Sequence, residues 1–264
     1  MAMSREKVSA LYFSPTGNTK FVCETIANYL GTEVVSYDLT TCQNRARSFE
    51  FDEGDVVVIG VPCYYGRMPD VKQSFFEGVK GKNTLAVLIT TYGNREYEDT
   101  LLEMKNEAEA AGFKCIAAGA FITQHCLNSD MAKNRPDDLD RDSIKQFAEL
   151  VKEGLTTLES SQEIQLRVGG NFPYKEVKPS GMVPVTLEHC GQCMACQVDC
   201  PMGAISPLDA REIDKKLCIL CGRCIKYCPT KAKELPEQVR EHVKAIGLRC
   251  TERKEPEFFY SFNF

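Results

Sequence analysis

Eight of the fourteen cysteines of this 264-residue chain lie in one short stretch. They form two copies of the spacing C-x2-C-x2-C-x3-C-P, at residues 190–201 and 218–229. Two residues between cysteines let one tight turn direct three sulfur atoms and several backbone N–H groups toward a single centre, and the proline then ends the turn. Iron–sulfur clusters, zinc sites and disulfides all use closely spaced cysteines, but zinc ribbons pair C-x2-C units without the third cysteine and the C-P.

The repeated pattern resembles that of bacterial two-cluster ferredoxins. That resemblance implies two [4Fe-4S] clusters, with the fourth cysteine of each run crossing to the other cluster. It implies that one cluster is bound by Cys190, Cys193, Cys196 and Cys228. The other would be bound by Cys218, Cys221, Cys224 and Cys200.

A second candidate site lies near the start of the chain, at residues 14–20, with the sequence SPTGNTK. It follows an expected strand at 8–13 and precedes a helical pattern that stops at Gly31. Hydroxyl groups and successive backbone amides in such a loop can surround a phosphate, which also interacts favourably with the helix dipole. Gly17 suits the turn because it tolerates a positive φ. The alternative is an ordinary capped turn without a ligand.

This loop resembles the S/T-x-T-G-N-T loop of flavodoxins, which holds the 5′-phosphate of FMN. The resemblance implies FMN binding by Ser14, Thr16, Gly17, Asn18 and Thr19. It also implies two loops around the isoalloxazine ring, formed by Pro62, Tyr64, Tyr65 and Gly66 and by Thr91, Tyr92, Gly93 and Asn94. The chain has no tryptophan, so Tyr64, Tyr65 or Tyr92 would have to cover the flavin. Neither GxGxxG nor GxxxxGK[ST] occurs in the chain.

Two further residues fall in or near these loops. Cys63 could be a redox-active thiol beside a flavin, but a small packing residue is the favoured interpretation. His125 could reach the flavin or a substrate, but no acid–base partner accompanies it in the sequence, which favours a structural loop histidine.

Apolar runs that alternate with amphipathic segments predict an α/β fold with a flavodoxin-like, doubly wound parallel sheet. Five strands in the order 2-1-3-4-5 are expected, at residues 8–13, 33–37, 56–61, 85–90 and 114–122. Helices are expected after the phosphate loop and at residues 70–79, 96–111 and 139–158. Aspartates at positions 137, 138, 140 and 142 indicate the start of the last helix, where the helix dipole favours negative charge.

The domain organisation follows from a change in composition. Residues 1–163 are expected to form the FMN-binding domain, and the Pro/Gly-rich residues 164–184 a linker. Residues 185–235 are expected to form an α+β ferredoxin-like domain with two [4Fe-4S] clusters. Residues 236–264 should provide a helix at 237–246 and an aromatic tail, which we expect to pack against its own domain.

Composition excludes several classes of protein. Hydrophobic residues make up 43% and charged residues 26% of the chain, as in globular proteins. Residues 1–165 carry 17 basic and 25 acidic side chains and residues 166–264 carry 15 and 12, so neither part resembles a nucleic-acid binder. The chain lacks an apolar run of about 20 residues and a signal-peptide pattern, which predicts a cytoplasmic protein without a membrane segment. Abundant reduced cysteine is typical of such a compartment, and an anaerobic setting follows as a hypothesis.

These features predict an electron-transfer protein. Electrons would pass between FMN, two [4Fe-4S] clusters and an external redox partner protein. One alternative is a flavin-dependent reductase of a small molecule that receives electrons from the clusters. Another is a ferredoxin whose first domain has no flavin and serves only for docking. Whether the protein is an enzyme stays open at this point.

Overall fold

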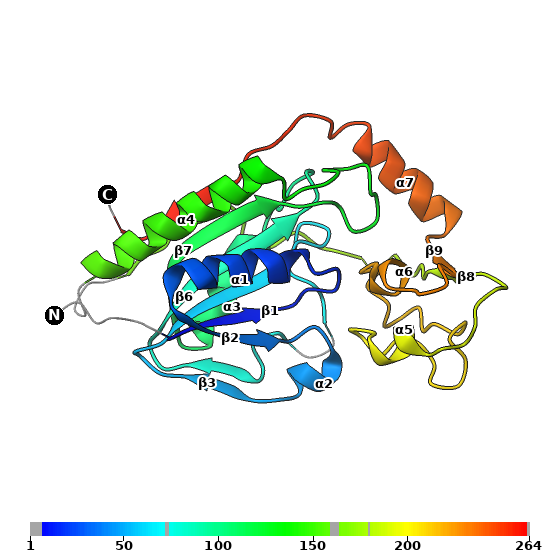
Figure 1. The fold of residues 1–264 in the computed structure, drawn as a ribbon, viewed down its shortest axis with the longest axis horizontal. Coiled ribbons are helices and arrows are strands. Elements are labelled where there is room, and N and C mark those ends of the chain that lie inside the picture. Colours follow the sequence, from blue (N-terminus) through cyan, green and yellow to red (C-terminus); the bar gives the residue numbers. More distant parts are fainter. Residues whose placement is uncertain (1–6, 72–73, 159–163, 179, 263–264) are drawn as a thin grey trace.

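The computed structural model describes residues 7–71, 74–158, 164–178 and 180–262. It has two parts, an α/β body with a central sheet and a smaller cysteine-rich region at residues 185–234 (Figure 1). The arrows of β1, β2 and β7 point toward the cysteine-rich region in this view. The loops at the carboxyl ends of the parallel strands therefore face the cysteines.

The central sheet has six strands in the order β10-β7-β6-β4-β1-β2. Five of them run parallel and follow the order 2-1-3-4-5 when numbered among themselves, whereas β10 pairs antiparallel with β7. The prediction of five strands is therefore one strand short. The strands are β1 (Lys7–Tyr12), β2 (Glu33–Asp38), β4 (Val56–Pro62), β6 (Thr84–Tyr92), β7 (Phe113–Ile122) and β10 (Glu257–Tyr260).

The middle of the sheet is buried on both faces. Every residue of β6 is buried, and six of the seven residues of β4 are. Strands covered on both sides have continuous apolar sequences rather than alternating ones, which is why these two runs are recognisable in the sequence. The side chains of the two faces belong to two separate hydrophobic clusters, one on each side of the sheet.

Helices cover both faces of the sheet (Figure 1). α1 (Asn18–Leu30) and α4 (Asp138–Thr157) pack on one face, where Ile26 and Phe147 share a core with Val58 of β4. α3 (Thr100–Ala110) packs on the other face through Leu101, Met104 and Ala108. The remaining helix of the body is α2 (Cys42–Arg45).

The helix expected at residues 70–79 does not form in the described part of that segment, and residues 72–73 lie outside the description. Residues 75–78 form a turn, and β5 (Val79–Gly81) pairs with β3 (Phe49–Phe51) in a small parallel sheet. Phe75 and Phe76 are both buried in the same core although they are neighbours in sequence. The strand pairing at Val79 and the burial of both rings oppose a regular helix, which would turn adjacent side chains about 100° apart.

The aromatic tail packs within this chain, as expected, but on the α/β body rather than on the cysteine-rich region that it follows. Residues 257–260 form β10, and Phe258 stacks on Phe121 and Phe147 with ring centroids 5.6 and 5.0 Å apart. The ring of Phe262 fills the space beside Gly154 of α4. The tail thus completes one edge of the sheet and part of the core beneath α4.

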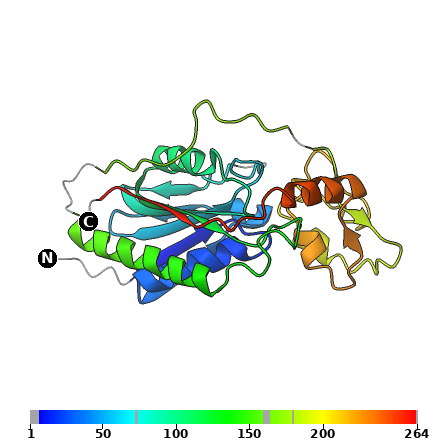
Figure 2. The same ribbon diagram turned by 90° about the horizontal axis from the view of Figure 1, so that it is seen from above.

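The cysteine-rich region is joined to the body at both ends (Figure 2). Its entry segment, residues 164–178, forms no helix or strand but is anchored, because Leu166 is 2% exposed and Asp99 accepts hydrogen bonds from the backbone N–H groups of Asn171 and Lys175. Its exit runs through α7 to β10. The elements are β8 (Val185–Thr186), α5 (Ala195–Val198), α6 (Arg223–Lys226), β9 (Lys233–Glu234) and α7 (Glu237–Gly247).

Gly60 of β4 allows α1 to approach the sheet closely. We therefore expect Gly60→Ala to lower the free energy of unfolding by about 1–3 kcal/mol, which is the usual cost of overpacking a core. A Cβ atom there would collide with Sγ of Cys23 and lie 3.0 Å from a methyl carbon of Thr19. Urea unfolding followed by circular dichroism measures the change. Gly54→Ala is the control, because no atom lies within 4 Å of its Cβ position, and an equal effect in both variants would contradict the packing argument.

Candidate functional site

The two cysteine runs have the same backbone conformation. Left-handed residues recur at equivalent positions, which are Gln192 and Leu220, Met194 and Gly222, and Gly203 and Lys231. In each run the sulfur of the fourth cysteine accepts a backbone N–H at 3.3 Å, from Ala204 to Cys200 and from Ala232 to Cys228. The repeat seen in the sequence is therefore a structural repeat, with amides directed at sulfur as the spacing suggests.

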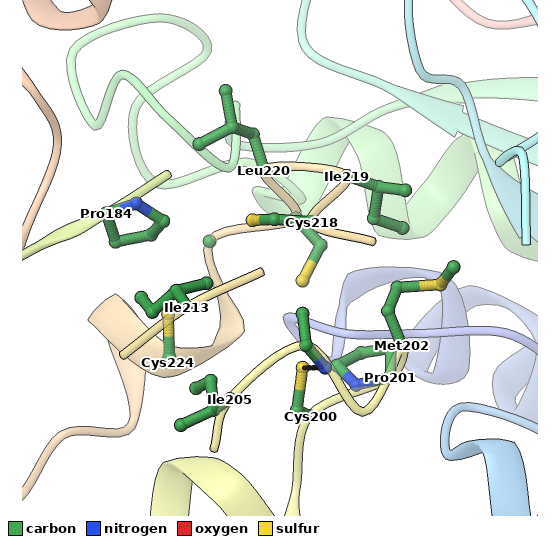
Figure 3. Close-up of a pocket in the computed structure, with 13 residues that line it drawn as sticks. Pro184, Cys200, Pro201, Met202, Ile205, Ile213, Cys218, Ile219, Leu220 and Cys224 are labelled. Carbon is green, nitrogen blue, oxygen red and sulfur yellow. Dashed lines mark hydrogen bonds between the residues drawn. The ribbon is translucent and has the colours of Figure 1, made fainter. Parts of the chain in front are cut away.

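Four of the predicted ligands line one small cavity of about 20 Å³ (Figure 3). Cys200 of the first run lies there with Cys218, Cys221 and Cys224 of the second. The labelled side chains of Ile205, Ile213 and Leu220 line the same space and make its walls apolar. The structure thus brings together the crossed set of cysteines rather than the four of one run.

The other four predicted ligands are grouped around Cys196. Burial raises the pKa of Cys196, Lys233 lowers it, and the nearby Cys190, Cys193 and Cys228 raise it. Burial likewise raises the pKa of Cys224 to about 12, and there Cys196 is one of the contributing neighbours. The two sets of cysteines are therefore adjacent through Cys196 and Cys224.

The described residues offer no group of three His, Cys, Asp or Glu side chains close enough to bind a single metal ion. A zinc ion needs four ligands within about 2.3 Å of one point, whereas a four-iron cluster spreads its thiolates around a larger body. The prediction of clusters therefore rests on the spacing of the cysteines.

The predicted phosphate loop lies at the carboxyl end of β1. Gly17 adopts φ 89° and precedes α1, whose N-terminus favours an anion. Gly17 has no side chain to cap the helix, and Ser14 caps only the N–H of Lys20. Ser14 Oγ accepts the backbone N–H of Lys20 at 2.9 Å, and Thr19 Oγ1 lies 2.7 Å from Thr91 Oγ1. Asn18 donates to the carbonyl of Gln124 at 3.0 Å. These bonds connect the loop to the ends of β6 and β7.

The two predicted isoalloxazine loops differ in accessibility. Tyr65 is 48% exposed at the tip of a tight turn, with φ 57°, and Tyr64 beside it is half-buried. Tyr92 is 4% exposed and packs against Tyr97 with ring centroids 5.5 Å apart. Of the three tyrosines considered for the flavin, Tyr64 and Tyr65 are therefore the accessible ones.

The loop after β6 is occupied by other contacts. The ring of His125 covers Gly93, and the Asn94 side chain donates to the carbonyls of Cys250 and Glu252 at 2.9 and 2.8 Å. Asn94 thereby fixes the segment that leads to β10. The sequence did not reveal this role, because the partners lie more than 150 residues away.

Cys63 and His125 both behave as structural residues. Burial raises the pKa of Cys63, and its thiol lies 3.6 Å from the carbonyl oxygen of Glu96, so the thiol stays protonated at neutral pH. His125 Nδ1 accepts the backbone N–H of Leu127 at 3.1 Å, which requires a neutral ring. Burial, together with the nearby Arg95, lowers the pKa of His125 to about 4.

The buried imidazole makes stability depend on pH. An unfolded histidine binds a proton near pH 6.5 but folded His125 only near pH 4, so stability falls as the pH drops from 6.5 toward 4. The difference corresponds to about 3 kcal/mol. Urea unfolding of the protein and of His125→Gln across this range measures it, and the variant should have the shallower slope. Parallel slopes would contradict the assignment.

Comparison with known protein families matches residues 10–126 to the flavodoxin domain. The N-terminal part of this chain is a flavodoxin domain. A second match assigns residues 211–234, which include the second cysteine run, to the 4Fe-4S binding domain. The resemblances to flavodoxins and ferredoxins and the α/β fold expected from the sequence are thereby confirmed.

Two curated relatives match the chain only over short stretches. A component of the ion-translocating oxidoreductase complex of Methanosarcina acetivorans is 45% identical over 47 residues, which are 17% of this chain and 18% of that protein. A component of the NAD(P)H-quinone oxidoreductase of Gloeobacter violaceus is 28% identical over 83 residues, 25% of this chain and 40% of that protein. Among solved structures, an archaeal flavodoxin is 14% identical with a TM-score of 0.38, covering 56% of this chain and 98% of its own.

A flavodoxin domain binds FMN and a 4Fe-4S domain binds an iron–sulfur cluster, so the protein has an electron-transfer role. The residues present fit both groups. A helix N-terminus preceded by a left-handed glycine suits a phosphate, and an apolar cavity lined by four cysteines suits a cluster. Within the described residues, no helix is long and apolar enough to cross a membrane.

The 4Fe-4S domain contacts the predicted phosphate loop of the flavodoxin domain directly. Arg223 and Lys226, which flank Cys224 on α6, donate to the carbonyls of Pro15 and Thr16 at 2.9 and 2.7 Å. Tyr227 donates to Thr16 at 3.2 Å, and its hydroxyl would lie 3.3 Å from a Cβ atom at Gly17. The helix that carries one cysteine of the cavity therefore contacts the predicted FMN site.

A buried arginine forms a second connection between the domains. Arg45 is 6% exposed and donates to the carbonyls of Leu39 and Thr40 in the flavodoxin domain and to that of Pro201 at 2.7 Å. Pro201 follows Cys200, so Arg45 fixes the start of the turn after the crossing cysteine. Arg45, Arg223 and Lys226 had no recognisable sequence signal, because their partners are backbone carbonyls in the other domain.

Proposed function

We propose that this protein transfers electrons between FMN, two [4Fe-4S] clusters and an external redox partner protein. FMN would be held by the phosphate loop at residues 14–19 and by the loops around Tyr64 and Thr91. One cluster would be bound by Cys218, Cys221, Cys224 and Cys200, and the other by Cys190, Cys193, Cys196 and Cys228. The flavodoxin domain would span residues 1–163 together with the added strand β10, and the ferredoxin-like domain residues 185–235, with residues 164–184 as the linker.

The observation that carries this proposal is the position of the cavity cysteines beside the flavin loops. Tyr64 and Tyr65 are close enough for their pKa values, raised mainly by burial, to be raised further by Cys221 and Cys218 respectively. A Cβ atom at Gly222 would lie 2.9 Å from the carbonyl oxygen of Cys126, at the end of the flavodoxin sheet. This cluster site therefore adjoins the flavodoxin domain.

The other site is suited to an external partner. Its Cys193 is exposed and its other three cysteines are half-buried. The two curated relatives bear the names of components of oxidoreductase complexes, which supports a protein donor or acceptor. Two cluster sites that are adjacent through Cys196 and Cys224 would then link this partner to the flavin.

Anaerobic purification followed by iron, sulfide and flavin analysis tests the proposal. We expect about eight irons and one FMN per chain, because two cubane clusters contain eight irons. Gly17→Ala should lose FMN and keep iron, since a side chain is strained at φ 89° and would approach Tyr227. Eight irons without flavin, even after FMN is added, would contradict the proposal and favour a flavin-free docking domain.

A second candidate function is reduction of a small polar molecule. A cavity of about 480 Å³ lies between the domains, lined by Tyr65, Lys216 and Cys218 and by the Arg67–Glu103 ion pair, and its size is typical of ligand sites. Burial, with Glu103 nearby, raises the pKa of Glu107 in its wall. Turnover of a candidate acceptor that Arg67→Met abolishes, with cofactor content unchanged, would support this function. Turnover that free FMN reproduces would reject it.

A further inference from the structure

Lys233 is a buried cation in the 4Fe-4S domain, at a position where the other half of the repeat has an apolar residue. Cys200-Pro201-Met202-Gly203-Ala204 leads to Ile205, and Cys228-Pro229-Thr230-Lys231-Ala232 leads to Lys233. Both Ile205 and Lys233 are 3% exposed. The fold thus accepts an apolar side chain here, and the charge in the second half is not needed to build the turn.

No carboxylate pairs with Lys233 among the ion pairs of the described residues. Its Nζ donates to Thr186 Oγ1 at 2.6 Å and to the carbonyl oxygen of Ala210. Both acceptors are neutral, so they satisfy the ammonium's hydrogen bonds but not its charge. The carboxylate of Asp209 is close enough for Lys233 to contribute to lowering its pKa, but Asp209 is exposed and solvent screens it. The buried ammonium therefore still favours a further negative group nearby in the working protein.

Besides Asp209, the neighbouring groups that can carry negative charge are cysteines of both sets. Lys233 lowers the pKa values of Cys196 in one set and of Cys218 and Cys224 in the other, against the larger effect of burial. Its side chain enters from β9, where Lys233 pairs with Thr186 of β8. The preceding residue, Ala232, donates its backbone N–H to Cys228 Sγ at 3.3 Å, and Ile205, the counterpart of Lys233, lines the cavity with Cys200 and Cys218. Lys233 therefore lies at the cysteines by its place in the repeat as well as by its effect on them.

We propose that the Lys233 ammonium is a shared counter-charge for the two cluster sites and raises the reduction potential of both clusters. Each cluster with its four thiolates is an anion, and reduction adds one more negative charge. A fixed cation in a weakly polar interior stabilises the reduced form more than the oxidised form. Lys233 would then make electron entry more favourable at both sites at once. The inference rests on the proposed binding of clusters at these cysteines.

Redox titration of the anaerobically purified protein, followed by electron paramagnetic resonance, tests the inference with three variants. Lys233→Met removes the charge at similar volume, Lys233→Gln also retains a hydrogen-bond donor, and Lys233→Arg retains the charge. We expect each cluster of the two neutral variants to have a reduction potential about 59 mV lower than in the unmodified protein. At a fixed potential, this corresponds to about a tenfold lower ratio of reduced to oxidised cluster. Lys233→Arg should stay near the unmodified protein.

Lys215→Met is the matched control, because Lys215 is exposed and the same loss of charge is screened by solvent there. Its two clusters should keep the potentials of the unmodified protein.

Iron analysis of the unmodified protein comes first, and absence of clusters there would reject the proposed function itself. Neutral variants with full iron content and unchanged potentials would overturn the inference, as would a shift at one cluster only. If neutral variants lose clusters, retention in Lys233→Arg supports the counter-charge, whereas loss in all three overturns it.

Discussion

Cys200→Ser is expected to reduce the iron content from about eight to about four per chain. Cys200 lies in the first run, but the structure places its side chain in the cavity formed by Cys218, Cys221 and Cys224. A serine oxygen is a poor substitute for a soft thiolate ligand of iron, so the cluster in this cavity should be lost. Iron and sulfide analysis after anaerobic purification measures the loss.

Double variants reveal which cluster is lost. Cys200→Ser with Cys218→Ala should remove no more iron than either change alone, because both act on one site. Cys200→Ser with Cys190→Ala should remove nearly all iron, because Cys190 belongs to the other set. The opposite pattern would show that each run binds its own cluster. Cys250→Ser, outside both runs, is the control and should keep full iron content.

Asp140→Ala is expected to lower the free energy of unfolding by about 3–5 kcal/mol, the usual effect of removing one partner of a buried ion pair. Asp140 and Arg135 have side chains only 3% and 5% exposed, and Arg135 donates through Nε at 2.8 Å. Asp140 also accepts the backbone N–H of Asp137 at 2.9 Å in the capping box of α4. Urea unfolding at equal cofactor loading measures the change.

Asp138→Ala is the matched control for the Asp140 prediction. Both aspartates lie in the first turn of α4 and interact similarly with the helix dipole, a contribution of about 0.3–1 kcal/mol. Asp138, however, is fully exposed, and its nearest cation, Arg141, is 4.0 Å away. A similar loss in the two variants would mean that the dipole, rather than the buried pair, accounts for the effect.

Local patterns explain what the sequence predicted well. The strands β4 and β6 are recognisable because burial on both faces demands continuous apolar residues. The helix start at Asp137 is confirmed because capping depends on residues within one turn. The cysteine runs and the phosphate loop are likewise short segments whose chemistry depends on neighbouring residues.

The features that the sequence did not predict depend on distant partners. Strand β10 forms because Phe259 pairs with Ala118 across the edge of the sheet. The helix expected at residues 70–79 was wrong because pairing of Val79 with Phe49 outweighs local helical preference. Arg45 and Lys233 bond to carbonyl oxygens at Pro201 and Ala210, and backbone acceptors leave no mark on the sequence.

The pairing of β10 with β7 also has a consequence for synthesis of the chain on the ribosome. Strand β7 is complete once residue 122 has emerged, but its outer edge has no partner until residues 257–260 follow. At about 5–20 residues per second, this interval of some 135 residues lasts on the order of ten seconds. During that time an apolar strand edge is open to pairing with another chain. Both cysteine runs emerge within the same interval, so cluster assembly and closure of the sheet compete for the same nascent chain.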